Sequence, residues 1–151
     1  MTLLRSGLLA IAGCAMAAGA LAGIHVCANT DWLLAFDAGL DVINFDAYGY
    51  MDRFALYGEA CDAFWARGGI VAWGIVPTND PEAIVKETGE SLARRLLEGM
   101  SGFVSDRTPL SRILEQSLIT PSCGCGSLSE ELTARVLSLN EEVSRSVRKS
   151  L

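Results

Sequence analysis

Four short apolar runs, each followed by an amphipathic stretch, divide most of the chain into repeating units. Each run is apolar at successive positions rather than at alternate ones, which is typical of parallel strands covered on both faces. An alternation of such strands with helices predicts βα units around a parallel sheet. The four predicted strands cover residues 23–29, 42–48, 70–78 and 118–123.

Amphipathic helices are predicted between these strands, because apolar residues recur there every three or four positions. The first stripe consists of Phe54, Tyr57, Cys61 and Trp65. The second consists of Ile84, Thr88, Leu92 and Leu96. The last consists of Leu128, Leu132, Val136, Leu139, Val143 and Val147. Asp80 with Pro81, and Ser127 with Glu130 at capping-box spacing, mark the starts of the second and last helices.

Four βα units make about half of a (β/α)8 TIM barrel, which typically takes about 250 residues. We therefore predict an α/β fold with one partial barrel domain over residues 1–151. Within it, residues 1–22 form a barrel helix, residues 23–151 form the four units, and residues 99–117 form an irregular insertion with a short helix at 110–115. Unpaired strand edges indicate that a partner completes the barrel or that the chain is a fragment.

Composition and charge narrow the possible partners and location. The chain is 50% hydrophobic and 20% charged, as in soluble globular proteins, and its net charge of −6 with dispersed basic residues argues against nucleic-acid binding. Five cysteines, an odd number, favour reduced thiols in the cytoplasm over a disulfide framework.

The first 23 residues imitate a secretory or lipoprotein signal, so a secreted or lipid-anchored protein is the alternative. We prefer a buried helix, because cleavage at such a signal would leave the first core strand close behind with no tether before it. The run is too short and too rich in Gly and Ala for a membrane span.

Candidate metal ligands lie at the predicted carboxyl ends of the strands, where (β/α) barrels place their active sites. His25 and Cys27 are two positions apart in an extended strand, so their side chains point to the same face. Cys123 ends the fourth strand, next to the positive end of the helix that follows. Cys125 could also bind a metal, but a bend at the strand end favours Cys123. An imidazole with thiolates predicts zinc.

Asp46, at the end of the second strand, is predicted as the fourth zinc ligand. The carboxylate follows an apolar run and would supply an oxygen ligand at the same edge of the sheet. Two other roles are open for it: a partner that orients His25, or a turn or cap residue.

Four further residues near strand ends are candidate substrate contacts. Tyr48 and Trp73 could form the wall of a pocket, although both are equally compatible with ordinary barrel packing. Asn29 and Asp31 follow the His-x-Cys pair in the first loop. Asp31 could contact a substrate amine or cap a helix that begins at Trp32.

Four runs at these strand ends form a long, ordered set: residues 23–32 (GIHVCANTDW), 45–48 (FDAY), 72–78 (AWGIVPT) and 120–129 (TPSCGCGSLS). They resemble the zinc-binding C-terminal barrel of cobalamin-independent methionine synthase, and more closely its stand-alone prokaryotic relatives. The resemblance covers about residues 10–147. It implies that His25, Cys27 and Cys123 are zinc ligands and that Asp46 occupies the place of the family's glutamate ligand. It also implies methyl transfer to a thiol such as homocysteine, from methylfolate or a methylated corrinoid protein.

The chain departs from this family at three points. Asp46 is one methylene shorter than glutamate. The segment 76–79 lacks the family's Asp and His, and His25 is the only histidine, which favours a pre-activated methyl donor. The first four barrel strands are missing.

The predicted function is therefore a zinc-dependent thiol methyltransferase of the methionine synthase type, acting as the C-terminal half of a split or truncated barrel. An N-terminal half-barrel or self-association would complete it. The alternative is a non-catalytic zinc-binding remnant or assembly subunit. A uroporphyrinogen decarboxylase-like reaction uses a related barrel but does not use this set of metal ligands.

Overall fold

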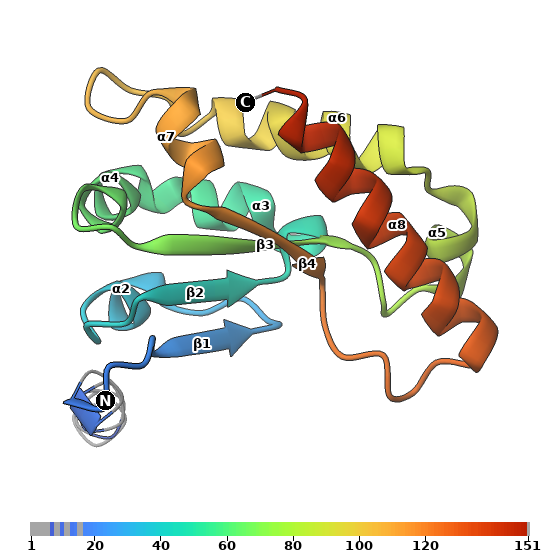
Figure 1. Ribbon diagram of the computed structural model, residues 1–151, viewed down its shortest axis with the longest axis horizontal. Helices are drawn as coiled ribbons and strands as arrows, with labels where there is room; N and C mark the ends of the chain where they lie inside the picture. Colours follow the sequence, from blue (N-terminus) through green and yellow to red (C-terminus); the bar gives the residue numbers. More distant parts are fainter. Residues whose placement is uncertain (1–6, 8–9, 11–12, 15–16, 151) are drawn as a thin grey trace.

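The computed structural model describes residues 7, 10, 13, 14 and 17–150 of the chain, and a four-stranded sheet forms its centre (Figure 1). The strands are β1 (Gly23–Val26), β2 (Val42–Phe45), β3 (Ile70–Val76) and β4 (Ser117–Pro121). They lie in the order β1-β2-β3-β4, and every neighbouring pair is parallel. Sequential parallel strands require a crossover between them, so the predicted α/β class with βα units is confirmed.

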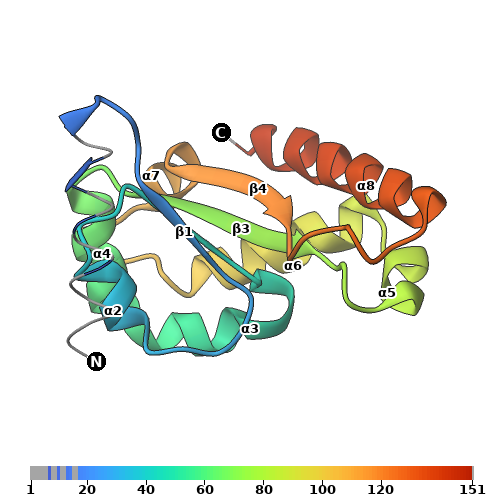
Figure 2. The same cartoon turned by 90° about the horizontal axis from the view of Figure 1, so that it is seen from below.

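Helices supply these crossovers. The first crossover contains α2 (Trp32–Phe36). The second contains α3 (Ala47–Phe54), the 3-10 turn η1 (Ala55–Tyr57) and α4 (Gly58–Ala66). The third contains α5 (Pro81–Lys86), α6 (Gly89–Ser101) and α7 (Leu110–Glu115), and α8 (Glu130–Arg148) follows β4. In Figure 2, α2, α3 and α4 lie together on one side of the strands, and α8 runs beside β4. Among the helices of the described residues, none is both long and apolar enough to cross a membrane.

The two faces of the central strands differ in chemistry, because successive side chains of a strand point to opposite faces. The face packed against the helices carries fully buried side chains: Ile43, Phe45, Val71, Trp73 and Ile75. The opposite face carries Asn44 on β2 and the small residues Ala72 and Gly74 on β3. His25 of β1 and Thr120 of β4 bond to Asn44 and so share this second face. The helix-covered face holds the core, and the other face carries the polar groups.

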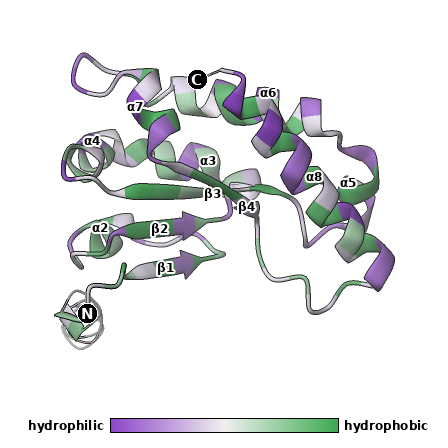
Figure 3. Ribbon diagram, in the orientation of Figure 1, coloured by the Kyte–Doolittle hydropathy of each residue, from purple (hydrophilic) through white to green (hydrophobic). Residues whose placement is uncertain are grey.

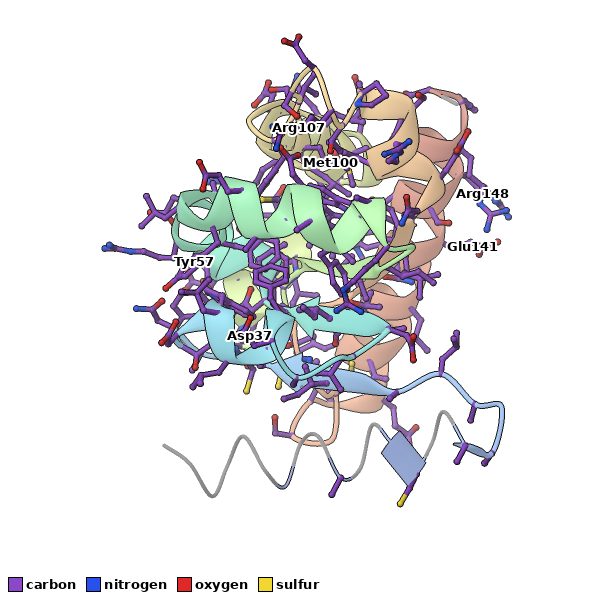
Figure 4. All side chains as sticks on the ribbon, turned by 90° about the vertical axis from the view of Figure 1, so that its left-hand side faces the viewer. Asp37, Tyr57, Met100, Arg107, Glu141 and Arg148 are labelled. Carbon is purple, nitrogen blue, oxygen red and sulfur yellow. The ribbon has the colours of Figure 1, made fainter. Side chains whose placement is uncertain are left out.

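Aromatic side chains fill the core between the helices and the sheet. Phe54 of α3 lies at its centre, stacked on Phe45 with ring centroids 4.1 Å apart and in edge contact with Trp32 and Trp73. Figure 3 shows β3 as almost continuously hydrophobic. In Figure 4, Glu141 and Arg148 extend from α8 away from the sheet. The amphipathic stripes predicted from the sequence are therefore mainly core, as expected.

One predicted helix start is confirmed and the other is wrong. Asp80 is the N-cap of α5 and Pro81 lies in its first turn, as predicted. The single helix predicted after Asp80 is divided into α5 and α6, and Thr88 is the N-cap of α6. The Thr88 hydroxyl accepts from the Ser91 backbone N–H in a capping box, so Thr88 is not part of the apolar stripe. Likewise α8 begins after Ser129, whose hydroxyl accepts from the Leu132 backbone N–H, and not after the predicted Ser127. In both cases a hydroxyl that satisfies free helix N–H groups fixes the boundary.

The helix predicted over residues 1–22 falls largely outside the described residues. Those described before Ala22 are exposed, and Ala22 is the first buried one among the described residues. Within the predicted insertion at 99–117, α7 has the bounds predicted for its short helix, although α6 extends to Ser101.

Candidate metal centre

Three side chains with metal-binding atoms converge at the carboxyl ends of the strands. A ring nitrogen of His25 and the Sγ atoms of Cys27 and Cys123 all lie within 4.8 Å of one another. His25 belongs to β1 and Cys27 follows it directly, whereas Cys123 lies in the loop after β4. Figure 1 shows this loop running past the arrowheads of β2 and β1. The structure thus brings together the three residues that the sequence predicts as ligands.

The two thiols of this group interact directly. A hydrogen bond with Cys123, together with the charge of that group, raises the pKa of Cys27 above its ordinary value. Two neighbouring thiolates repel each other, so each disfavours ionisation of the other until a cation lies between them. His25 and Cys27 are exposed and Cys123 is half-buried, so a ligand can reach the group from solvent.

Asn44 is a site residue that the sequence analysis missed. Its Oδ1 lies 2.5 Å from Nδ1 of His25, and its Nδ2 donates to Ala72 O and to Thr120 Oγ1, both at 2.8 Å. A signal was present in the sequence, because Asn44 is a polar residue inside an otherwise apolar strand. A polar side chain in that position needs partners on the same face of the sheet.

Asp46 is not part of the three-residue group. Its side chain caps α3 and accepts from the Gly49 backbone N–H at 2.8 Å. Burial raises the pKa of this carboxyl, while the N–H groups of Gly49 and Tyr48 partly offset the increase. Three roles were open for Asp46: zinc ligand, partner of His25 and helix cap. The position of its side chain agrees with the helix cap. Its carboxylate still interacts with His25 through charge.

The loop after β4 is held so that Cys123, and not Cys125, faces the group. Ser122 is buried, and its Oγ lies 3.2 Å from the backbone N of Thr78 and 3.0 Å from Thr78 Oγ1. The backbone N–H of Ser122 also donates to Val76 O at 2.8 Å. These bonds attach the loop to the end of β3. Cys125 packs against the hydrophobic core instead, in agreement with the preference for Cys123.

The first loop places its two candidate substrate contacts differently. Asn29 is exposed and contributes no atom to the group. Asp31 is the N-cap of α2, and its Oδ1 accepts from the Leu33 backbone N–H at 3.2 Å. The helix begins at Trp32, as the capping alternative predicted.

Tyr48 and Trp73 also have structural partners. The Tyr48 hydroxyl donates to Glu87 Oε1 at 3.0 Å, and the guanidinium of Arg95 lies over its ring at 4.1 Å. Trp73 is fully buried, and its Nε1 donates to Ser117 Oγ at 2.8 Å. Its indole therefore belongs to the aromatic core and not to a pocket wall, whereas Tyr48 remains half-buried near the ends of the strands.

Fold and site together define an α/β protein with a candidate His-Cys-Cys metal centre at the carboxyl edge of a parallel sheet. Comparison of the chain with protein-family models, with curated proteins and with solved structures found no match. The support for a metal site is therefore the geometry of its own residues.

Proposed function

We propose that the chain binds zinc through His25, Cys27 and Cys123 and acts as a thiol methyltransferase of the methionine synthase type. The observation that carries this proposal is the convergence of one imidazole and two thiols within 4.8 Å. These are preferred zinc ligands. Structural zinc sites usually have four protein ligands, whereas catalytic sites have three and an open position. A group of three therefore favours a site that accepts a substrate.

The proposed reaction follows from this ligand set and from the motif resemblance. Zinc bound at the site would lower the pKa of a thiol in the open position and so make it nucleophilic at neutral pH. Methyl transfer forms a sulfur–carbon bond, breaks the bond between the methyl group and its donor, and releases the thiol proton to water. The resemblance of residues 23–32 and 120–129 indicates homocysteine as acceptor and methylfolate or a methylated corrinoid protein as donor. His25, the only histidine, is used as a ligand, so a donor that needs no protonation by histidine is favoured.

We further propose that the sheet is the C-terminal half of a (β/α)8 barrel. Within the described part of the chain, β1 and β4 each pair with a strand on one side only. A groove of about 510 Å³ lies beside β4, between α7 and α8, and Leu118 in its wall is 50% exposed. The face that carries Asn44 and Thr120 would be the barrel interior. Strands of an N-terminal half-barrel, or of a second copy, would pair with both edges and enclose His25 and Cys27.

Zinc content tests the metal site. Elemental analysis of the reduced, purified chain should give about one zinc per molecule, and Cys27→Ala and Cys123→Ala should each abolish it. Cys125→Ala is the matched control, because Cys125 lies in the same loop but packs against the core. A folded chain without zinc, or an equal loss in the Cys125 variant, would contradict the proposed ligands.

Methyl transfer tests the activity. The zinc-loaded chain would be incubated with homocysteine and either methylfolate or methylcobalamin, alone and with an N-terminal half-barrel of the methionine synthase type. Formation of methionine that disappears in Cys123→Ala would support the proposal. Bound zinc without methylation under any of these conditions would favour the non-catalytic zinc-binding remnant, for which the exposure of His25 and Cys27 is the supporting observation.

A further inference from the structure

We infer that Asn44 is a positioning residue that fixes the tautomer of His25 and so selects Nε2 as its metal-binding atom. The functional part of this role depends on the proposed zinc site, but its geometry depends only on hydrogen bonds. His25 and Asn44 are register partners on β1 and β2, and Asn44 and Ala72 are partners on β2 and β3. Their side chains and backbone groups therefore meet on one face of the sheet.

The orientation of the Asn44 amide is determined by its other two contacts. Nδ2 lies 2.8 Å from Ala72 O and 2.8 Å from Thr120 Oγ1. A backbone carbonyl oxygen can only accept, so the atom facing Ala72 must be the amide nitrogen. Both hydrogens of that nitrogen are then used. The reversed amide would place two acceptor oxygens against each other and lose the donor bonds to Ala72 and Thr120.

The fixed amide determines where the imidazole carries its proton. Oδ1 of Asn44 can only accept, so Nδ1 of His25, 2.5 Å away, must carry the hydrogen of this bond. In the neutral ring Nε2 then has a free lone pair, which a metal ligand requires. Histidine ligands commonly donate their second N–H to an oxygen in this way. Here the accepting oxygen is anchored on β3 and β4, so the bonded network crosses all four strands.

The tautomer can be measured directly, because His25 is the only histidine of the chain. A long-range ¹H–¹⁵N NMR spectrum of the metal-free protein, recorded at about pH 9 where histidine rings are neutral, should show protonation at Nδ1. Asn44→Leu removes the acceptor at similar volume and should give a mixture of both tautomers. Thr120→Val, the matched control, keeps the Ala72 bond and should retain the Nδ1 form.

Zinc affinity supplies the second readout. In competition with a chelator, Asn44→Leu should bind zinc about 10- to 100-fold more weakly. Protonation at Nε2 in the unsubstituted protein would overturn the inference without any variant, and so would an unchanged tautomer in Asn44→Leu. Protonation at Nδ1 in a chain that binds no zinc would overturn the proposed function but leave the positioning of His25 by Asn44 intact.

Discussion

Substitution of Asp46 distinguishes helix capping from metal binding. Asp46→Asn keeps a side-chain oxygen for the Gly49 N–H but removes the charge, and Asp46→Ala removes both. The carboxylate lies outside the three-ligand group and is already bonded at the start of α3. We therefore expect both variants to retain about one zinc per chain and to differ in stability.

The expected magnitudes follow from the cap. Loss of an N-cap side chain typically costs about 1 kcal/mol, within a range of about 0.5–2. Asp46 is only 7% exposed and its bond to Gly49 is 2.8 Å long, so water cannot easily replace it, and we expect about 1–2 kcal/mol for Asp46→Ala. In a domain of this size that lowers the melting temperature by about 2–8 °C. Asparagine caps as well as aspartate, so Asp46→Asn should stay within about 0.5 kcal/mol.

Thermal unfolding followed by circular dichroism, with and without zinc, would measure these differences beside elemental analysis of each variant. The capping explanation is refuted if Asp46→Asn loses its zinc while its zinc-free form melts like the unsubstituted protein. That result would make Asp46 the fourth ligand or the charged partner that orients His25.

Two further predictions concern the core. Phe54→Ala, in the fully buried aromatic cluster, should lower the free energy of unfolding in urea by about 3–5 kcal/mol. Val85→Ala, at a side chain that is 69% exposed, should change it by about 0.5 kcal/mol or less. Similar effects of the two would contradict the assigned core. Burial raises the pKa of Cys61, so the folded thiol keeps its proton at a pH where the unfolded thiol loses it. Stability should therefore fall as pH rises above about 8.5, and Cys61→Ala should reduce that slope in urea titrations between pH 8 and 10; an unchanged slope would argue against a protonated buried thiol.

The sheet and the convergence of His25, Cys27 and Cys123 could be predicted, because apolar runs identify the strands and parallel strands end at one edge of a sheet. The two-residue separation of His25 and Cys27 places them on one face of any strand. The break before α6 could not be seen in the same way, because Thr88 occupies an apolar stripe position while its hydroxyl bonds to Ser91. The contact of Asn44 with His25 requires the strand register, which apolar spacing alone does not determine.

The separation of the two cysteines along the chain has a consequence for local opening. Cys27 follows the first strand and Cys123 follows the last, so a shared ion would close a loop of about 100 residues, much as a cross-link does. β1 has four residues and, within the described part of the chain, one neighbouring strand, which makes it the strand expected to detach most readily. Backbone amides of β1 should therefore exchange with deuterium faster after chelation, while those of β3, with strands on both sides, should change little. The ion proposed to activate a thiol would then also stabilise the attachment of β1 to the sheet.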